Sequence, residues 1–418
     1  MALYSPEQFA DRADGDALGA ESRLQTYMIA FVNGHSHDAS SAPAIPAPGS
    51  GVSLLGRNLY LVFVASWFLH LGARVPALGA IRIDLILVVV LTILAFAGKS
   101  KERTATTEID KVLRVLFVYA LLVTPFVEWP GSVIRTGIPE FIKAVVFYYF
   151  TIAFIKSESD LKALVFVFLA CQLFRVLEPL YLHVTLGYWG SVASMSNWEF
   201  LNRLSGSPYD VVNPNGLAAI ICTVLLFLYY LAGLSWINTL AFLALAPACL
   251  YALALTGSRS GFVTLIVILA VIVLKSRHRF LVGAAGVLVI VAGFQFLSAD
   301  QQDRYLSVFG AGEKNLETAD QRFDSMEADF LVAMRRPVLG HGLGTSQEAN
   351  ANFGGRNQPS HNLYLEVVQE LGLIGLAIFL LFLKSILTAS VQLRRAYADA
   401  YAAKFPLRLV DALQVWCG

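Results

Sequence analysis

The stretch SHNLYLE at residues 360–366 marks the point where a polar segment gives way to a long apolar one. Ser360 or Asn362 can cap a helix here, because a side-chain oxygen at the cap accepts a hydrogen bond from an otherwise unpaired backbone N–H. Glu370 falls in the first turns of that helix, where a carboxylate suits the positive end of the helix dipole. His361 therefore lies at the mouth of an apolar helix, and its imidazole can exchange a proton near neutral pH. A histidine that only covers a helix start is the structural alternative.

The composition is that of a membrane protein. Of the 418 residues, 56% are hydrophobic and 15% are charged, whereas a soluble domain carries about 25% charged residues. Apolar runs recur along the chain, each long enough to cross a hydrocarbon layer of about 30 Å. We therefore expect an all-α fold, a polytopic transmembrane bundle of about 10 spans with a large loop outside. The net charge of +1 gives no indication of nucleic acid. No Cys/His cluster appears, so we expect neither a metal nor a cofactor.

The apolar runs predict the order of the chain. The ten spans are expected at residues 57–73, 82–98, 112–128, 139–155, 161–183, 214–234, 236–256, 261–274, 280–298 and 363–388. The corresponding domains are a flexible cytoplasmic tail (1–56), a bundle of nine spans (57–298), an outer loop with an amphipathic helix (299–362), the tenth helix (363–390) and a cytoplasmic tail (391–418).

Lysine and arginine set the orientation, because they accumulate in cytoplasmic loops. Basic groups occur at residues 99–114, 156–162, 275–279 and 394–408. All four fall inside if the N-terminus is cytoplasmic. The same topology puts Arg203, Arg259 and His361 on the opposite face of the membrane.

The turn GSRSG at residues 257–261 joins two of these spans. Gly257 can close one helix in the left-handed conformation, and Ser258 or Ser260 can cap the next. A guanidinium at Arg259, beside a helix N-terminus, suits a phosphate. An arginine that binds a lipid headgroup is the alternative.

The preceding outer connector contains Arg203 and ends at Asn213-Pro214, which reads as an ordinary helix start. That start does not account for Arg203. In the span before the connector, Arg175 and Glu178 have the i, i+3 spacing of a structural ion pair.

The outer loop 299–362 is too long for a simple connection. Residues 322–334 carry apolar side chains at nearly helical spacing, and Pro337 ends this helix. The glycine turn that follows, residues 340–344, lacks the spacing of a dinucleotide fingerprint. We interpret His341 as a bystander in this turn.

Four motifs in this order resemble the O-antigen ligase and polymerase family. They are the stretch from Arg203 to Asn215, GSRSG at 257–261, Arg322 with PVLGHGLG at 337–344, and SHN at 360–362 with ELGLIG at 370–375. The resemblance covers roughly residues 57–390 and is strongest from residue 200 on.

The resemblance implies a metal-independent glycosyltransferase in a bacterial inner membrane, with its active site at the periplasmic face. The donor would be a glycan on undecaprenyl pyrophosphate, and the acceptor a glycan or lipid A-core hydroxyl. By motif, Arg203 and Arg259 match the arginines that hold the pyrophosphate, and His361 matches the catalytic histidine. Arg322, Asn215 and Glu370 are further candidate substrate contacts. Other polysaccharide-assembly membrane proteins are candidate partners.

The chemistry agrees with this resemblance. A pyrophosphate leaving group needs charge stabilisation, and arginine stays charged and offers a planar fork of donors. A hydroxyl nucleophile gains from a general base. No covalent nucleophile is evident, so direct displacement would invert the anomeric centre.

Several functions remain open at this stage. A polymerase, a ligase and a protein O-oligosaccharyltransferase share these motifs. A transporter or flippase for the same lipid-linked glycan would place charges near the bilayer midplane, and the sixth to ninth spans are almost free of them. Residues 407–418 resemble the beginning of a further span, so we expect the chain to fall C-terminally short of about 11–12 spans.

Overall fold

The computed structural model describes residues 51–97, 107–190, 202–276, 278–295, 297, 299–306, 317–360, 362–398 and 404–417. Every regular element in these ranges is a helix, so the all-α prediction is confirmed there. The N-terminal tail lies outside the described residues except at its end, where the first helix begins.

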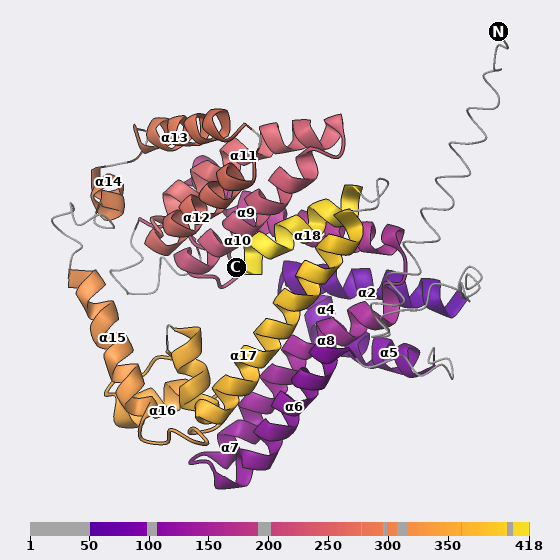
Figure 1. Cartoon of the computed structure of the whole chain (residues 1–418), viewed down its shortest axis with the longest axis vertical. Helices are drawn as coiled ribbons and strands as arrows, with labels where there is room; N and C mark the ends of the chain where they lie inside the picture. The colour runs from indigo at the N-terminus through magenta and orange to yellow at the C-terminus, as the bar shows by residue number, and fades with distance from the viewer. Residues whose placement is uncertain are drawn as a thin grey trace. The chain divides into compact units, whose positions relative to one another are not determined.

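A helix is present at each of the ten stretches for which a span was predicted (Figure 1). These helices are α2 (Gly51–Leu69), α5 (Ile83–Ala97), α6 (Glu108–Val123), α8 (Ile138–Phe154), α9 (Glu158–Leu186), α10 (Pro214–Ala232), α11 (Trp236–Thr256), α12 (Arg259–Lys275), α13 (Arg279–Gln295) and α17 (Leu363–Ala398).

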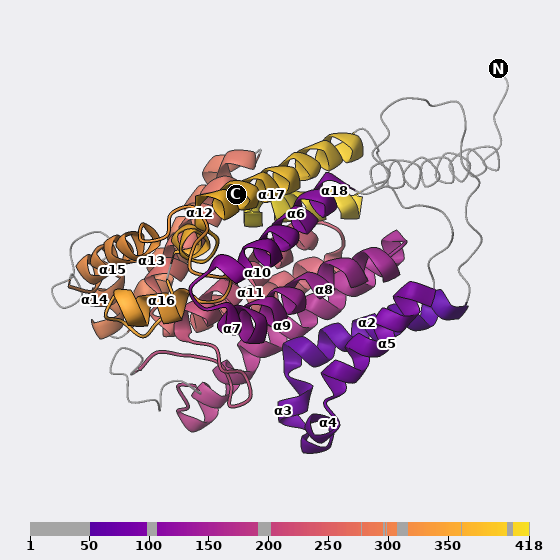
Figure 2. The same ribbon diagram turned by 90° about the horizontal axis from the view of Figure 1, so that it is seen from below.

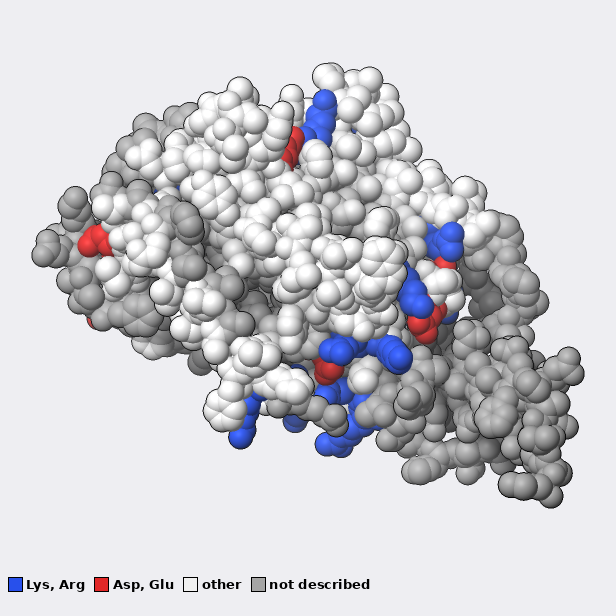
Figure 3. All heavy atoms as spheres, turned by 90° about the horizontal axis from the view of Figure 1, so that it is seen from above, with Lys and Arg blue, Asp and Glu red and all other residues white. Residues whose placement is uncertain are grey.

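Five helices among the described residues are long and apolar enough to cross a membrane, judged by length and composition. They comprise Pro130–Phe154, Glu158–Leu186, Pro214–Ala232, Trp236–Thr256 and Leu363–Arg395. Much of the described surface visible in Figure 3 is free of Lys, Arg, Asp and Glu. Both findings fit a membrane protein, while the count of about ten spans stays a prediction.

The chain forms two compact units, which we describe separately. Unit 1 contains Ser100–Thr151 and Glu317–Ala403, and unit 2 contains Gly49–Lys99, Ile152–Leu316 and Lys404–Gly418.

Helix α10 is the centre of unit 2. It packs against α9, α11, α12 and the C-terminal helix α18 (Lys404–Cys417). Figure 2 shows α9, α10 and α11 side by side. Its side chains Leu217, Ile221 and Leu226 are completely buried. At Gly261, a Cβ atom would lie 2.5 Å from the Cβ of Ala218, so glycine permits α12 to approach α10 closely.

The ion pair between Arg175 and Asp210 attaches the connector, which we define as residues 202–213, to the rest of unit 2. Arg175 of α9 donates to both carboxylate oxygens of the buried Asp210, at 2.6 and 3.0 Å. Glu178 instead accepts from Arg74 at the end of the short helix α3 (Leu71–Arg74). The predicted pairing of Arg175 with Glu178 is therefore wrong, because each side chain finds a partner outside its own helix.

In unit 1, helix α17 packs against α6, α15 (Glu317–Ala333) and α16 (Ser346–Phe353). Figure 1 shows α15 and α16 beside the first part of α17. Helix α15 includes most of the stretch for which the sequence predicts an amphipathic helix.

The long helix α17 is interrupted at Gly372, whose φ of 68° lies in the left-handed region. A Cβ atom there would lie 2.1 Å from the carbonyl oxygen of Val338. The interruption frees carbonyl groups of α17 to bind the glycine turn, since His341 N donates to Gln369 O at 2.7 Å and Gly342 N donates to Glu370 O at 2.9 Å. These two hydrogen bonds thus join the glycine turn to the kink of α17.

Candidate functional site

The turn between α11 and α12 in unit 2 has the geometry that its sequence predicts. Gly257 closes α11 with a φ of 56°. Ser258 caps α12, and its Oγ accepts a hydrogen bond from Gly261 N at 3.2 Å. Arg259 follows as the first residue of α12 and is partly buried. Its guanidinium is therefore attached to a capped helix N-terminus, which favours an anion.

Arg203 lies almost entirely inside unit 2, with 4% of its surface exposed. Its Nε donates to the carbonyl oxygen of Thr256 at 2.8 Å, and its Nη2 donates to Asn215 Oδ1 at 3.0 Å. The next residue, Leu204, donates its N–H to Leu255 O at 2.9 Å. These bonds hold the connector against the end of α11. The turn that follows, residues 257–261, is called the arginine turn below.

Asn215 is the second residue of α10 and links three segments. Its Oδ1 accepts from Arg203 Nη2 and also from Ser258 Oγ, at 2.8 Å. The helix start itself is capped by Asn213, whose Oδ1 accepts from Gly216 N at 2.8 Å. The sequence predicted this cap. It did not predict that Asn215 would connect Arg203 with the cap of α12.

The structure therefore brings Arg203, Asn215 and the start of α12 together in unit 2. Sequence reasoning missed the parts played by Thr256 and Ser258, because a backbone carbonyl and a capping serine carry no signal of long-range contact. The arrangement supplies two guanidinium groups, a carboxamide and a helix N-terminus, all of which suit a phosphate.

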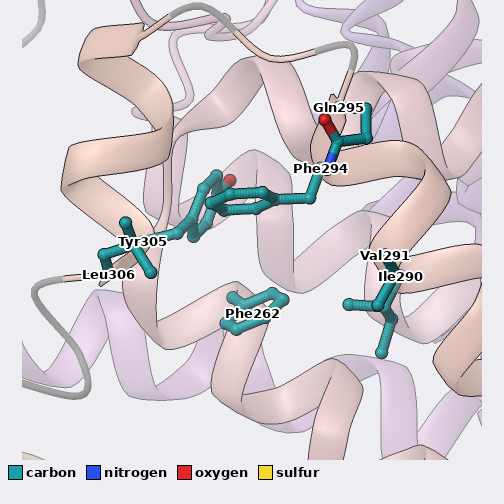
Figure 4. A pocket seen from close by; sticks show the side chains of 7 residues that line it. All are labelled: Phe262, Ile290, Val291, Phe294, Gln295, Tyr305 and Leu306. Carbon is teal, nitrogen blue, oxygen red and sulfur yellow. The ribbon is translucent and has the colours of Figure 1, made fainter.

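A cavity of about 210 Å³ lies beside the first turn of α12 (Figure 4). Its lining is apolar apart from Gln295 and comes from α12, α13 and α14 (Ala299–Leu306). Phe262, three residues after Arg259, faces Tyr305, and their ring centroids are 5.1 Å apart. The hydroxyl of Tyr305 donates to Ala254 O at 3.1 Å, near the end of α11. The arginine turn thus borders an apolar space.

The predicted catalytic residue, His361, lies outside the described residues. Its two neighbours are described, and both are fixed. Ser360 is buried, and its Oγ donates to Asp329 Oδ2 at 2.8 Å. Asn362 caps α17, since its Oδ1 accepts from Tyr364 N at 3.0 Å and from Leu365 N at 3.2 Å. Of the two capping residues that the sequence allowed, the structure selects Asn362.

Asp329 holds the segment before the cap on its other side as well. Its Oδ1 accepts from Arg356 Nη2 at 3.0 Å, and only 3% of its surface is exposed. Its backbone carbonyl accepts from the fully buried Gln369 of α17, at 2.9 Å. Sequence reasoning did not single out Asp329, because an acidic residue in an amphipathic helix is ordinarily on its solvent face.

The remaining predicted contacts fall in unit 1. Glu370 is partly buried, and its Oε1 accepts a hydrogen bond of 3.4 Å from Ser346 N at the start of α16. Arg322 is a residue of α15, but its side chain lies outside the described part of the chain.

His341 is completely buried in the glycine turn. Its Nδ1 lies 3.1 Å from Glu128 Oε2, and its Nε2 lies 3.0 Å from Val332 O. The indole of Trp129 stacks on its ring, with 5.8 Å between centroids. Both ring nitrogens thus have partners within unit 1, and His341 has a structural role there.

The helices and the phosphate-suited turn define a helical membrane protein with a candidate site for an anionic substrate. Residues 242–380 match the family model described as O-antigen ligase, which supports the resemblance found in the sequence. The matched range includes Arg259, Arg322, His361 and Glu370. No curated protein matches the chain. The match supports, in general terms, a membrane glycosyltransferase of the O-antigen ligase or polymerase type.

Proposed function

We propose that this chain transfers a glycan from undecaprenyl pyrophosphate to an acceptor hydroxyl at the periplasmic face of a bacterial inner membrane. The observation that carries the proposal is the turn of unit 2, where Arg203, Asn215 and the N-terminus of α12 are joined by hydrogen bonds. Such a site suits a leaving group that departs with two phosphates and needs no proton.

In this proposal, Arg203 and Arg259 supply the positive charge for the pyrophosphate. Arg259 is the more accessible of the two and offers its planar fork to phosphate oxygens. The guanidinium of Arg203 is almost fully buried, so its charge attracts the pyrophosphate from inside the protein and is little screened by water. Removal of either charge would weaken stabilisation of the leaving group.

His361 serves as the general base. It accepts the proton of the acceptor hydroxyl as the hydroxyl oxygen forms a bond to the anomeric carbon. The bond from that carbon to the pyrophosphate oxygen breaks, and the pyrophosphate keeps the electron pair. A single displacement of this kind inverts the anomeric centre and requires no metal. Asp329 and Asn362 fix the residues that flank this histidine.

The test uses the purified full chain in lipid nanodiscs with a synthetic undecaprenyl-pyrophosphate-linked repeat. Longer lipid-linked chains without another acceptor indicate a polymerase. If elongation is absent, transfer to added lipid A-core indicates a ligase, and transfer to an added peptide indicates a protein glycosyltransferase. If the donor remains intact with every acceptor while the chain is correctly inserted, the proposed function is wrong. Arg259→Lys should reduce this transfer. Arg279→Lys is its control, because it makes the same exchange at an exposed arginine at the start of α13.

A further inference from the structure

The carboxamide of Asn215 has a fixed orientation. Arginine has no acceptor, so the atom of Asn215 that lies 3.0 Å from Arg203 Nη2 must be the amide oxygen. The same oxygen accepts from Ser258 Oγ at 2.8 Å. Ser258 Oγ in turn accepts from Gly261 N, and it also lies 3.1 Å from Ser260 Oγ, whose hydroxyl can donate to it. Two donors therefore converge on one oxygen, and the amide cannot rotate by half a turn without losing the bond from Arg203, which an NH2 group cannot accept.

The amide nitrogen of Asn215 consequently lies on the opposite side of the carboxamide from Arg203 and Ser258. Among the residues that the structure describes, no acceptor receives a hydrogen bond from this nitrogen, and the side chain is partly exposed. Its two N–H donors are at the first turn of α10, beside the start of α12. Both helices exceed eight residues, and both direct their N-termini to this region.

We propose that Asn215 donates its side-chain N–H groups to a phosphate oxygen of the lipid-linked donor. Arg203 then acts as a positioning residue, because it holds the amide oxygen and so turns the amide nitrogen toward the phosphate. This inference rests on the proposed function and adds a specific role for Asn215. It also explains why an arginine with 4% exposure is hydrogen-bonded to an asparagine that is more accessible.

The discriminating variant is Asn215→Asp. An aspartate keeps the oxygen that Arg203 and Ser258 need, and it adds an ion pair with Arg203, so the turn should fold normally. It also replaces the amide nitrogen with a second oxygen, which would repel phosphate. A structural asparagine would therefore tolerate aspartate, whereas a phosphate donor would not. The matched control is Asn213→Asp, because Asn213 is the exposed cap of the same helix and aspartate caps equally well.

The measurement is equilibrium binding of farnesyl pyrophosphate to the full chain in nanodiscs, with farnesol as the ligand that lacks phosphates. We expect binding on the order of 10- to 100-fold weaker for Asn215→Asp, since one charge-assisted hydrogen bond is lost. We expect a smaller change for Asn213→Asp and equal farnesol binding by all variants. An Asn215→Asp variant that binds farnesyl pyrophosphate like the wild type overturns the inference.

A further variant separates this inference from the proposed function. If Arg259→Ala binds farnesyl pyrophosphate as well as the wild type does, the turn is not a pyrophosphate site and the proposed function fails at this point. If Arg259→Ala loses binding while Asn215→Asp retains it, the site stands and only the role of Asn215 is refuted.

Discussion

The hydroxyl of Ser360 donates a hydrogen bond to Asp329, so the residue immediately before His361 is tied to helix α15. The other oxygen of Asp329 accepts from Arg356, four residues before Ser360. A buried carboxylate with two donors from one loop fixes that loop strongly, because loss of the carboxylate leaves both donors unpaired.

Replacement of Asp329 should impair turnover more than donor binding. Asp329→Ala removes the acceptor of Ser360 and should destabilise unit 1 by about 1–3 kcal/mol. A displaced base lowers turnover by about 10²-fold for a shift of roughly 1 Å. Asp324→Ala, an exposed acidic residue of the same helix, is the matched control. Turnover and farnesyl pyrophosphate binding are to be measured for both. Equal turnover for the two variants would show that Asp329 is not needed to position the base.

Arg259→Lys should lose activity although the charge is kept. Lysine presents a single ammonium group and cannot engage two phosphate oxygens with a planar fork. We expect a drop of at least about tenfold in kcat/KM for the lipid-linked donor, because one charge-assisted hydrogen bond contributes that much. Arg279→Lys makes the same exchange at an exposed position and should leave kcat/KM unchanged. If Arg259→Lys has the same kcat/KM as the wild type, Arg259 does not bind the phosphate through two parallel donors.

His361→Gln should abolish most turnover and leave donor binding intact, because glutamine cannot take up the proton. The wild type should gain activity as the pH rises through the pKa of an imidazole, about 6.5 when unperturbed, since only the neutral form is a base. His341→Gln should instead lower thermal stability, because that ring is buried between Glu128 and Val332. A His361→Gln enzyme with normal turnover and an unchanged pH profile would exclude the general base.

Gly372→Ala should destabilise the chain far more than Gly355→Ala. Both glycines have a positive φ, at 68° and 66°, so alanine meets backbone strain, on the order of 1–3 kcal/mol, at either site. Only at Gly372 would the new Cβ atom collide with a backbone oxygen, that of Val338 at 2.1 Å. At Gly355 no atom lies within 4 Å of it. Thermal unfolding in detergent compares the two, and equal midpoints would show that the kink is not tightly packed.

The predicted orientation can be tested by labelling single cysteines in intact spheroplasts. Val211 and Gln347 are exposed and belong to loops predicted to face the periplasm, so cysteines there should react with a membrane-impermeant maleimide. A cysteine at the exposed Lys111, in a loop predicted to be cytoplasmic, should react only after lysis. Three of the four natural cysteines, Cys171, Cys222 and Cys249, are buried and give little background, and Cys417 is replaced by serine. If only the cysteine at position 111 reacts before lysis, the predicted orientation is wrong and the opposite one holds.

The sequence predicted the helices well because their signal is local. Each apolar run, with caps such as Asn213 and Ser258, contains the information that its own helix needs. The arginine turn could be predicted for the same reason, since its glycine, cap and arginine are consecutive residues.

Partners far apart in the chain could not be predicted in this way. Arg175 and Glu178 looked like an i, i+3 pair, yet Asp210 and Arg74 compete successfully because they offer bidentate geometry inside the fold. The link between Asn215 and Ser258 crosses 43 residues, so spacing along the chain does not reveal it.

The pairing of Arg175 with Asp210 has a consequence for the order of synthesis. Asp210 follows Arg175 by 35 residues, so α9 enters the membrane before its arginine has a carboxylate partner. An unpaired arginine costs about 2.5–3.5 kcal/mol on insertion at the centre of a span, and less toward its outer end, where the connector meets Arg175. Gln172, three residues earlier in the same helix, accepts from Arg175 Nη1 at 3.0 Å and is available from the start. Gln172 can partner the arginine first, but the charge is neutralised only when the connector emerges, so we expect a nascent chain arrested before Asp210 to be cleared by membrane proteases faster than one arrested after it.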